Sequence, residues 1–174
     1  MIDIYLSRTE EKESPAARAL LLQVLEEEYG LGSPVILSGQ QGKPFVQDGP
    51  CFSISHSRGN IAVAVSQGEV GLDLEQVRPY HEKLPRRIFS REELLWFEGR
   101  GETRIDFFTL WTLKESYFKY LGTGLPGFPN GTVFEKNGAW KLRGSDLFFS
   151  VIQENNLLLT VCSQEQEEIR IHRV

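Results

Sequence analysis

The sequence predicts an α+β fold in which a long helix packed on antiparallel strands occurs twice. Three observations favour this fold. The chain has 174 residues, of which 40% are hydrophobic and 25% charged, which suits one compact domain with a real core. Two segments carry the apolar spacing of helices, and each precedes segments with the alternation of strands. The strand pattern also repeats weakly along the chain.

The first half is predicted to contain a strand, a helix and three further strands. Residues 2–6 read as the first strand. Ser14 predicts the N-cap of a helix, with Pro15 at the first helical position and Gly30 as the residue that closes it. Apolar residues recur at helical spacing between them, at Ala17, Leu20, Leu21, Val24 and Leu25. The expected strands that follow cover residues 52–54, 61–66 and 70–77.

The second half is predicted to repeat this order. Ser90 and Glu93 have the spacing of a capping box and open a short helix that ends at Gly99. The remaining predicted elements are a long aromatic helix over about 106–121 that stops at Gly122, Gly- and Pro-rich turns over 124–131, and strands that end at Val174.

An offset of 97 residues aligns positions 52–75 with positions 149–172, with 4 identities among 24 positions. Any two strands of similar pattern align about this well, so chance similarity stays open as an explanation. If the repeat is real, Asp73 and Glu75 correspond to Arg170 and His172, and only one half carries an acidic site. We then expect two similar α/β lobes, residues 1–78 and 79–174, in a pseudo-twofold arrangement with one active site in the cleft between them.

Charge and composition exclude several classes of protein. The net charge of −5 argues against general binding of nucleic acid. Cys51 and Cys162 give neither a disulfide framework nor a zinc pattern. The apolar runs are too short to cross a membrane, and no signal peptide precedes the first strand, so we expect a cytoplasmic protein.

Asp73 and Glu75 lie on one face of the strand predicted over 70–77. They stand ~7 Å apart along it, from a rise of ~3.3 Å per residue. Two carboxylates at this spacing could converge on one hard cation, with Gly71 leaving room beside them, and oxygen ligands suit Mg²⁺ or Mn²⁺. A solvated polar face of an edge strand is the commoner outcome for such a pair.

Glu115 and Lys119 are four residues apart and therefore neighbours on one face of the long helix. A surface ion pair worth ~0.3–0.5 kcal/mol would explain them. However, the helix is crowded with aromatic and aliphatic residues, which implies that it is largely buried. A charged pair in a buried helix needs a further reason to be there.

Two other stretches carry polar chemistry. Residues 55–59 combine hydroxyls, the His56 imidazole and a cation, which could cradle a phosphate or could simply form a turn. Residues 42–44 are not a Walker loop, because the required upstream glycine is absent. Five cations against the single acid Glu82 read either as a solvated segment or as a docking patch for an acidic partner: Arg78, Lys83, Arg86, Arg87 and Arg91.

Four motifs occur together in order, at residues 42–44, 52–57, 71–75 and 111–119. In this the chain resembles the 4′-phosphopantetheinyl transferase superfamily, in its surfactin-synthetase-activating (Sfp-like) branch. The specific motifs are Gly-Leu-Asp-Leu-Glu at 71–75 and Trp-Thr-Leu-Lys-Glu-Ser-Tyr-Phe-Lys at 111–119. The likeness runs from Arg18 to about Leu125.

The resemblance implies an enzyme that moves phosphopantetheine from coenzyme A to a serine of an apo acyl or peptidyl carrier protein and releases adenosine 3′,5′-bisphosphate. It implies that Asp73, Glu75 and Glu115 hold Mg²⁺ (or Mn²⁺). Glu115 and Lys119 are then the catalytic residues, and the coenzyme contacts are Arg18, Gly42, Lys43, Pro44, Ser55, His56 and Lys119. The basic stretch would face an acidic carrier protein, and internal duplication would make the chain a monomer.

Physical chemistry explains why such residues are needed. The phosphates of coenzyme A would be repelled by bare carboxylates, and a divalent cation reverses that charge. Glu115, or a metal-bound water, could take the proton of the serine nucleophile, and Lys119 could offset charge on the leaving phosphate. Glu93 stays open between a place near the site and a purely capping role.

The chain also departs from the family pattern. It is shorter than typical single-chain members, and upstream basic residues of longer relatives have no clear match. Ser53 stands where many relatives have asparagine. Two competing functions follow: a non-catalytic paralogue that binds coenzyme A or a carrier protein, and a Mg²⁺-dependent nucleotide hydrolase. The intact acidic set of Asp73, Glu75 and Glu115 disfavours the first, and the motif order disfavours the second.

Overall fold

The computed structural model describes residues 1–39, 41–123 and 131–174. Its helices are α1 (Glu13–Glu27), α2 (Pro85–Ile88), α3 (Arg91–Gly99) and α4 (Arg104–Leu121). Its strands are β1 (Ile2–Arg8), β2 (Ile36–Ser38), β3 (Pro44–Val46), β4 (Cys51–Ser57), β5 (Asn60–Ser66), β6 (Val70–Gln76), β7 (Val133–Lys136), β8 (Ala139–Leu142), β9 (Phe148–Glu154), β10 (Leu157–Ser163) and β11 (Ile169–Arg173). The mixture confirms the predicted α+β class.

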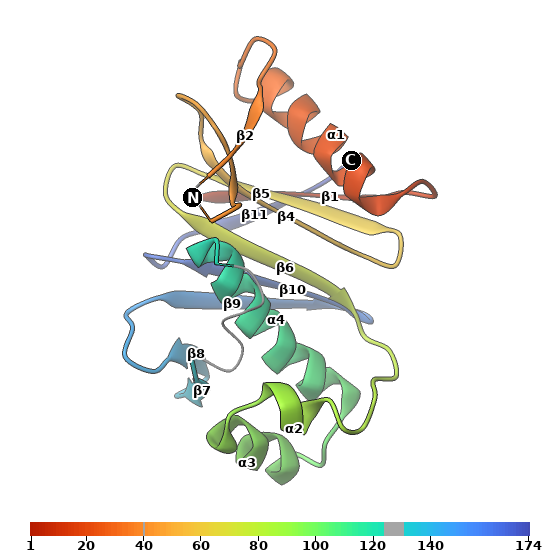
Figure 1. The fold of residues 1–174 in the computed structure, drawn as a ribbon, viewed down its shortest axis with the longest axis vertical. Coiled ribbons are helices and arrows are strands. Elements are labelled where there is room, and N and C mark those ends of the chain that lie inside the picture. The colour runs from red at the N-terminus through yellow and green to blue at the C-terminus, as the bar shows by residue number, and fades with distance from the viewer. Residues whose placement is uncertain (40, 124–130) are drawn as a thin grey trace.

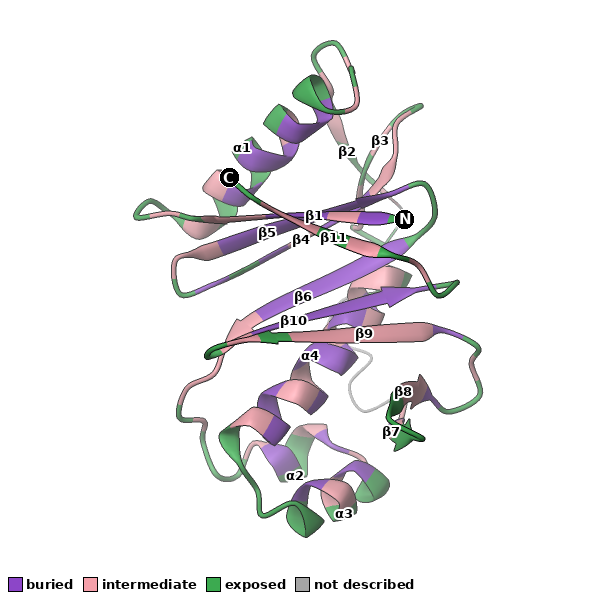
Figure 2. Cartoon of the chain, turned by 180° about the vertical axis from the view of Figure 1, so that it is seen from behind, coloured by how far each residue is buried: buried purple, intermediate pink, exposed green. Residues whose placement is uncertain are grey.

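Two sheets lie between two helices. One sheet has the strand order β11-β1-β5-β4 and the other β6-β10-β9. Helix α1 packs on the outer face of the first sheet and α4 on the outer face of the second, as Figure 1 shows. The inner faces share an apolar core built from alternate residues of β1, β6 and β10 and small alanines of β5. Figure 2 shows that β6 and much of β10 are buried, so the acidic strand lies inside the molecule.

Most predicted elements are confirmed. The capping box is present, since Ser90 accepts from the N–H of Glu93 and the Glu93 carboxylate accepts from the N–H of Ser90. The long helix ends as expected at Gly122, which has φ of +74°. The predicted turns at 124–130 lie outside the described residues.

The predicted start of the first helix is wrong by two residues. Helix α1 begins at Glu13, and its N-cap is Lys12, not Ser14. The Glu13 carboxylate accepts from the N–H of Gly59 and contacts His56, so tertiary bonds to the turn after β4 fix this end. At the other end, Gly30 has φ of +68° and lets the N–H of Leu31 return to the carbonyl of Leu25.

The strand bounds keep the offset of 97 residues. Shifting β4 and β5 by 97 gives the bounds of β9 and β10. Their pairings match as well, because Cys51 pairs with Ser66 as Phe148 pairs with Ser163. The two hairpins therefore have the same lengths and the same register, one in each sheet.

Strands β4 and β6 run alongside each other at the junction of the two sheets, but they are not joined by a backbone ladder. Serine side chains bridge them instead. The hydroxyls of Ser53, Ser55 and Ser57 accept from the N–H groups of Leu72, Leu74 and Gln76 respectively, at 2.9, 3.0 and 3.3 Å. Each serine and the residue whose N–H donates to it are 19 residues apart, and this constant difference shows that the two strands run parallel. We call this contact the serine seam.

Within the described part of the chain, no helix is both long enough and apolar enough to cross a bilayer.

Candidate active site

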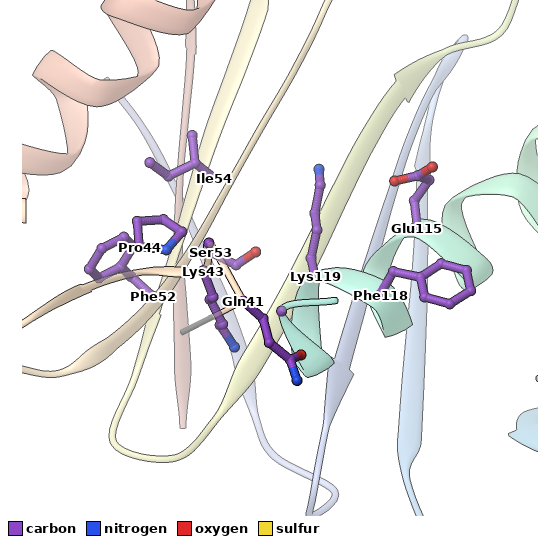
Figure 3. A pocket seen from close by; sticks show the side chains of 11 residues that line it. Gln41, Lys43, Pro44, Phe52, Ser53, Ile54, Glu115, Phe118 and Lys119 are labelled. Atoms are coloured by element: carbon purple, nitrogen blue, oxygen red, sulfur yellow. The ribbon is translucent and has the colours of Figure 1, made fainter. Parts of the chain in front are cut away.

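A pocket of about 420 Å³ lies beside the serine seam and is lined from both halves of the chain. Figure 3 shows Lys43, Pro44, Phe52 and Ile54 on one side and Glu115, Phe118 and Lys119 of α4 on the other. The predicted residues that line it are Gly42, Lys43, Pro44, Glu115 and Lys119. Segments about 70 residues apart thus meet around one cavity.

Asp73 is a buried carboxylate at the junction of β4, β6 and α4. Only 5% of the residue is exposed, which excludes the solvated edge face that such a pair usually forms. Its Oδ1 accepts from Lys119 Nζ at 2.7 Å and from Ser55 Oγ at 3.0 Å. Its Oδ2 is buried and has no hydrogen-bond partner in the described part of the chain. Asp73 therefore keeps one oxygen free for a ligand.

Glu75 lies two residues further along β6 and is held by different partners. Its Oε2 accepts from Ser57 Oγ at 2.6 Å and from an Arg78 guanidinium nitrogen at 2.5 Å. Arg78 also lies over the ring of Phe108, 4.8 Å from its centre. Arg78 therefore compensates the charge of Glu75 and is half-buried, so it is less available to a partner than the sequence suggested.

Glu115 faces these two carboxylates from α4. Burial raises its pKa to about 7, and the negative charges of Asp73 and Glu75 add to the rise while Lys119 opposes it. Lys119, although one helical turn away, directs its ammonium to Asp73 and Ser55. At neutral pH a proton can therefore enter or leave Glu115 at low cost.

Gly71 permits the close approach of α4 to β6 that brings these groups together. A Cβ at this position would lie 2.0 Å from the Ser116 carbonyl oxygen and 2.4 Å from the Tyr120 nitrogen. Both are backbone atoms and cannot turn aside. The space beside the carboxylates that Gly71 was expected to leave is thus filled by the backbone of α4.

The donor set has the right chemistry for a hard divalent cation, since all three side chains offer oxygen. Asp73 Oδ2 is buried without a hydrogen-bond partner in the described part of the chain, and the charges of Asp73 and Glu75 add to the rise that burial causes in the pKa of Glu115, so a cation would be favoured here. As the side chains stand, however, no three His, Cys, Asp or Glu groups within residues 1–39, 41–123 and 131–174 are close enough to hold one ion. Lys119 and Arg78 supply the balancing charge instead.

Lys43 lines the pocket with its stem, while its ammonium is engaged elsewhere. Nζ donates to Glu69 at 2.6 Å, to the Val70 carbonyl at 3.2 Å and to the Tyr120 carbonyl at 2.9 Å. The last contact lies at the C-terminal end of α4, where cations are favoured. Lys43 therefore ties the β2–β3 hairpin to α4 and β6, which shapes the wall of the pocket.

The other predicted coenzyme contacts are more dispersed. Ser55 is inside the site, but its hydroxyl already donates to Asp73 and accepts from Leu74 and Lys119. His56 lies on the face of β4 that carries Phe52 and Ile54, opposite to the face of Ser55. Its Nδ1 lies 3.0 Å from a carboxylate oxygen of Glu13. Arg18 is exposed on α1 and does not line the pocket. Roles for these residues in phosphate binding stay predictions.

Glu93 is fully buried in a structural contact away from the pocket. Its carboxylate accepts from Lys114 Nζ at 3.1 Å and from the N–H of Val133 at 2.9 Å, in addition to the capping bond. Lys114 also donates to the Gly131 carbonyl at 2.9 Å. This node joins α3, α4 and the start of β7, which favours the structural reading of Glu93.

The basic stretch divides into two parts. Arg78 belongs to the site, as described above. The other four cations are exposed on α2, α3 and the turn before them, and none forms an ion pair with an acid in the described part of the chain: Lys83, Arg86, Arg87 and Arg91. These four form the basic surface.

Sequence reasoning missed several pocket residues and the role of the seam. Phe52, Ile54 and Phe118 supply apolar walls, which looked like ordinary core residues. Ser57 was noted as part of a polar stretch, but not as a partner of Glu75. The spacing of Ser53, Ser55 and Ser57 at every second position was the available signal, because it places three hydroxyls on one face of a strand.

Comparison with known proteins gives a consistent result. Residues 69–162 match the model of the 4′-phosphopantetheinyl transferase superfamily. This segment contains both acidic motifs of the site. Among curated proteins, the 4′-phosphopantetheinyl transferase gsp of Aneurinibacillus migulanus is 36% identical over 100 residues, covering 56% of this chain and 42% of its own length.

Two further relatives match longer parts of this chain. The 4′-phosphopantetheinyl transferase Sfp of Bacillus subtilis (strain 168) is 34% identical over 112 residues, 61% of this chain and 50% of its own length. The 4′-phosphopantetheinyl transferase AcpT of Escherichia coli (strain K12) is 32% identical over 155 residues, 85% of this chain and 73% of its own length. The chain thus spans about half the length of the first two relatives.

Proposed function

The chain belongs to the 4′-phosphopantetheinyl transferase superfamily, and from this premise we propose that it transfers the 4′-phosphopantetheine group of coenzyme A to a serine of an apo carrier protein. The observation that carries the proposal is the junction of both motifs at one end of the pocket. Lys119 of α4 donates to Asp73 of β6 there, and Glu115 of α4 lies near enough to Asp73 and Glu75 for their charges to raise its pKa. In the reaction the serine oxygen forms a bond to phosphorus, the anhydride bond breaks, and adenosine 3′,5′-bisphosphate leaves.

Glu115 is the proposed proton acceptor for the serine hydroxyl. A base with a pKa near the working pH combines a useful deprotonated fraction with proton affinity. In the metal-free site the pKa of about 7 meets this condition. A bound divalent cation would lower this pKa and keep the Glu115 carboxylate deprotonated, ready to accept the proton. Lys119, which lies between the pocket and Asp73, is the proposed partner of the pyrophosphate, where it offsets charge that develops on the leaving phosphate.

Mg²⁺ is the proposed cofactor, with Asp73, Glu75 and Glu115 as its ligands and Mn²⁺ as a substitute. When bound, the ion would neutralise phosphate charge and stabilise the transition state as a Lewis acid. The buried Asp73 Oδ2 supports a cation at this point. With such an ion balancing Asp73, the Lys119 ammonium would be able to contact the phosphates as well.

Coenzyme A is proposed to lie in the pocket, with its nucleotide part against the Gly42–Pro44 segment. Pro44, Phe52 and Ile54 offer an apolar wall that suits a flat ring, and a pocket of about 420 Å³ is within the size range of small-molecule sites. Ser55, His56 and Arg18 are proposed as further contacts, for which Ser55 would exchange one of its present bonds.

An acidic carrier protein is the proposed partner, docked on the basic surface. Four exposed cations without internal acidic partners in the described part of the chain support this part of the proposal. We also propose that the two halves are similar lobes in a pseudo-twofold arrangement, supported by the hairpins β4–β5 and β9–β10 that share length and register at an offset of 97 residues.

The test is the intact mass of an apo acyl carrier protein after incubation with this protein, coenzyme A and Mg²⁺. We expect a gain of one phosphopantetheine, which is lost without metal and in the Asp73→Ala variant. No gain with any of several apo carrier proteins would contradict the proposal. Coenzyme binding measured by calorimetry would then identify a non-catalytic binding protein.

A further inference from the structure

We propose that Ser57 is a positioning residue that fixes the carboxylate of Glu75 in the site; the inference rests on the proposed function. Ser57 lies outside the pocket and is 6% exposed, so it does not act on a ligand directly. It lies on β4, while Glu75 lies on β6 of the other sheet. Its effect on the site therefore passes through the serine seam.

The hydrogen bonds of Ser57 are complete. A hydroxyl has one proton to donate and two lone pairs that accept. Ser57 Oγ donates to Glu75 Oε2 at 2.6 Å and accepts from the N–H of Gln76 at 3.3 Å. It also accepts a long contact of 3.5 Å from Arg78. Because its backbone partner directly follows Glu75, this one hydroxyl locks both the strand and the carboxylate that the strand presents.

The same arrangement occurs two residues earlier. Ser55 Oγ donates to Asp73 and accepts from the N–H of Leu74, the residue that follows Asp73. The period of two along β4 matches the period of two along β6, so each serine holds one carboxylate. A short O–H···O⁻ bond is the strong, charge-assisted kind, which limits how far Glu75 can turn.

Ser53 continues the seam without a carboxylate. Its hydroxyl accepts from the N–H of Leu72 at 2.9 Å, but the residue before Leu72 is Gly71. Ser53 therefore accepts a hydrogen bond from the backbone of β6 but holds no carboxylate. Comparison of Ser57 with Ser53 separates stabilisation of the seam from positioning of a ligand.

The experiment measures Mn²⁺ affinity of the intact chain by calorimetry, together with the melting temperature, for Ser57→Ala, Ser57→Thr and Ser53→Ala. Both alanine variants are expected to melt lower, because each removes an acceptor from a buried N–H. Only Ser57→Ala is expected to lose Mn²⁺ affinity, by roughly 10- to 100-fold, as is usual for partners that orient metal ligands. Ser57→Thr keeps the hydroxyl and is expected to restore affinity.

Three results would overturn the inference: equal Mn²⁺ affinity in Ser57→Ala and wild type, equal loss in Ser57→Ala and Ser53→Ala, or no rescue by Ser57→Thr. If Ser57→Ala does not fold, Ser57→Cys provides the loss, since a thiol is a weak donor of similar size. A wild-type chain that binds Mn²⁺ but transfers nothing contradicts the proposed function, while the affinities still test Ser57. A wild-type chain that binds no Mn²⁺ overturns the inference together with the metal site.

Discussion

At the scale of single residues, Glu115 shows how burial prepares a carboxyl for proton transfer. Three acidic groups share a site in which Lys119 and Arg78 are the compensating cations. Asp73 and Glu75 each have a cationic partner, whereas the pKa of Glu115 rises to about 7 mainly through burial. The cost of burying a carboxylate at this site therefore falls on the residue that the proposed reaction needs as a base.

This shift predicts a pH dependence of stability. Because the pKa of Glu115 rises from 4.5 to about 7 on folding, the native state holds the proton more tightly than the unfolded chain. The stability it contributes is present below the unfolded pKa and is lost as the pH rises through the folded pKa. In metal-free buffer, the gain in melting temperature of Glu115→Gln over wild type should be larger at about pH 8 than at about pH 5. An equal gain at both pH values would contradict the assignment.

The same variant tests catalysis. Glu115→Gln should lower the rate of transfer by about 10²- to 10⁴-fold, the usual contribution of a general base. Calorimetry should show coenzyme binding that is only partly weakened, because glutamine keeps the size of the Glu115 side chain and the rest of the pocket wall is unchanged. Transfer at the wild-type rate would remove Glu115 from the mechanism.

At the scale of elements, the contact of β6 with α4 is fixed by a single missing side chain. Gly71→Ala would bring a Cβ within 2.0 Å of a backbone oxygen of α4. We expect a loss of at least about 3 kcal/mol in the free energy of unfolding, the upper range for overpacking. Urea denaturation measures it. Gly99→Ala is the matched control, since a Cβ there meets nothing within 4 Å, and it should stabilise α3 by about 0.4–1 kcal/mol.

The node of Glu93 and Lys114 is a second contact between elements, and it predicts a loss of stability without a loss of chemistry. Glu93→Ala removes the carboxylate opposite a buried ammonium and should cost about 3–5 kcal/mol. Glu93→Gln keeps an acceptor for the Val133 N–H and should cost less. Below its melting temperature, the Gln variant should retain the wild-type kcat of transfer. A loss of about 10²-fold or more in kcat would instead make Glu93 a catalytic acid or base.

At the scale of the whole molecule, the parts that the sequence predicts are those set by local pattern. The alternation of β6 and the spacing of α4 predict that Asp73 shares a strand face with Glu75 and that Glu115 shares a helix face with Lys119. The resemblance of these two motifs to the family then makes the four residues candidates for the site. The alternate serines of β4 mark a polar face, but local pattern could not show that β6 is their partner, because each serine and the N–H that it bonds lie 19 residues apart and in separate sheets. Local pattern likewise cannot show that Lys119 prefers Asp73 to its helical neighbour Glu115.

The basic surface lies apart from the carboxylates, which predicts that it affects binding of the carrier protein and that the carboxylates affect the transfer step. The exposed cations of α2 lie outside the pocket, so they should affect encounter with an acidic carrier protein rather than the transfer step. Arg86→Glu with Arg87→Glu should lower kcat/KM by about tenfold or more through KM, leave kcat unchanged, and flatten the dependence on salt. Transfer kinetics over a range of ionic strength measures all three quantities.

Lys12→Glu with Lys136→Glu changes the net charge equally at exposed positions elsewhere on the chain, so it should leave KM near the wild-type value. If both double variants raise KM alike, total charge and not the basic surface guides the carrier protein to the site.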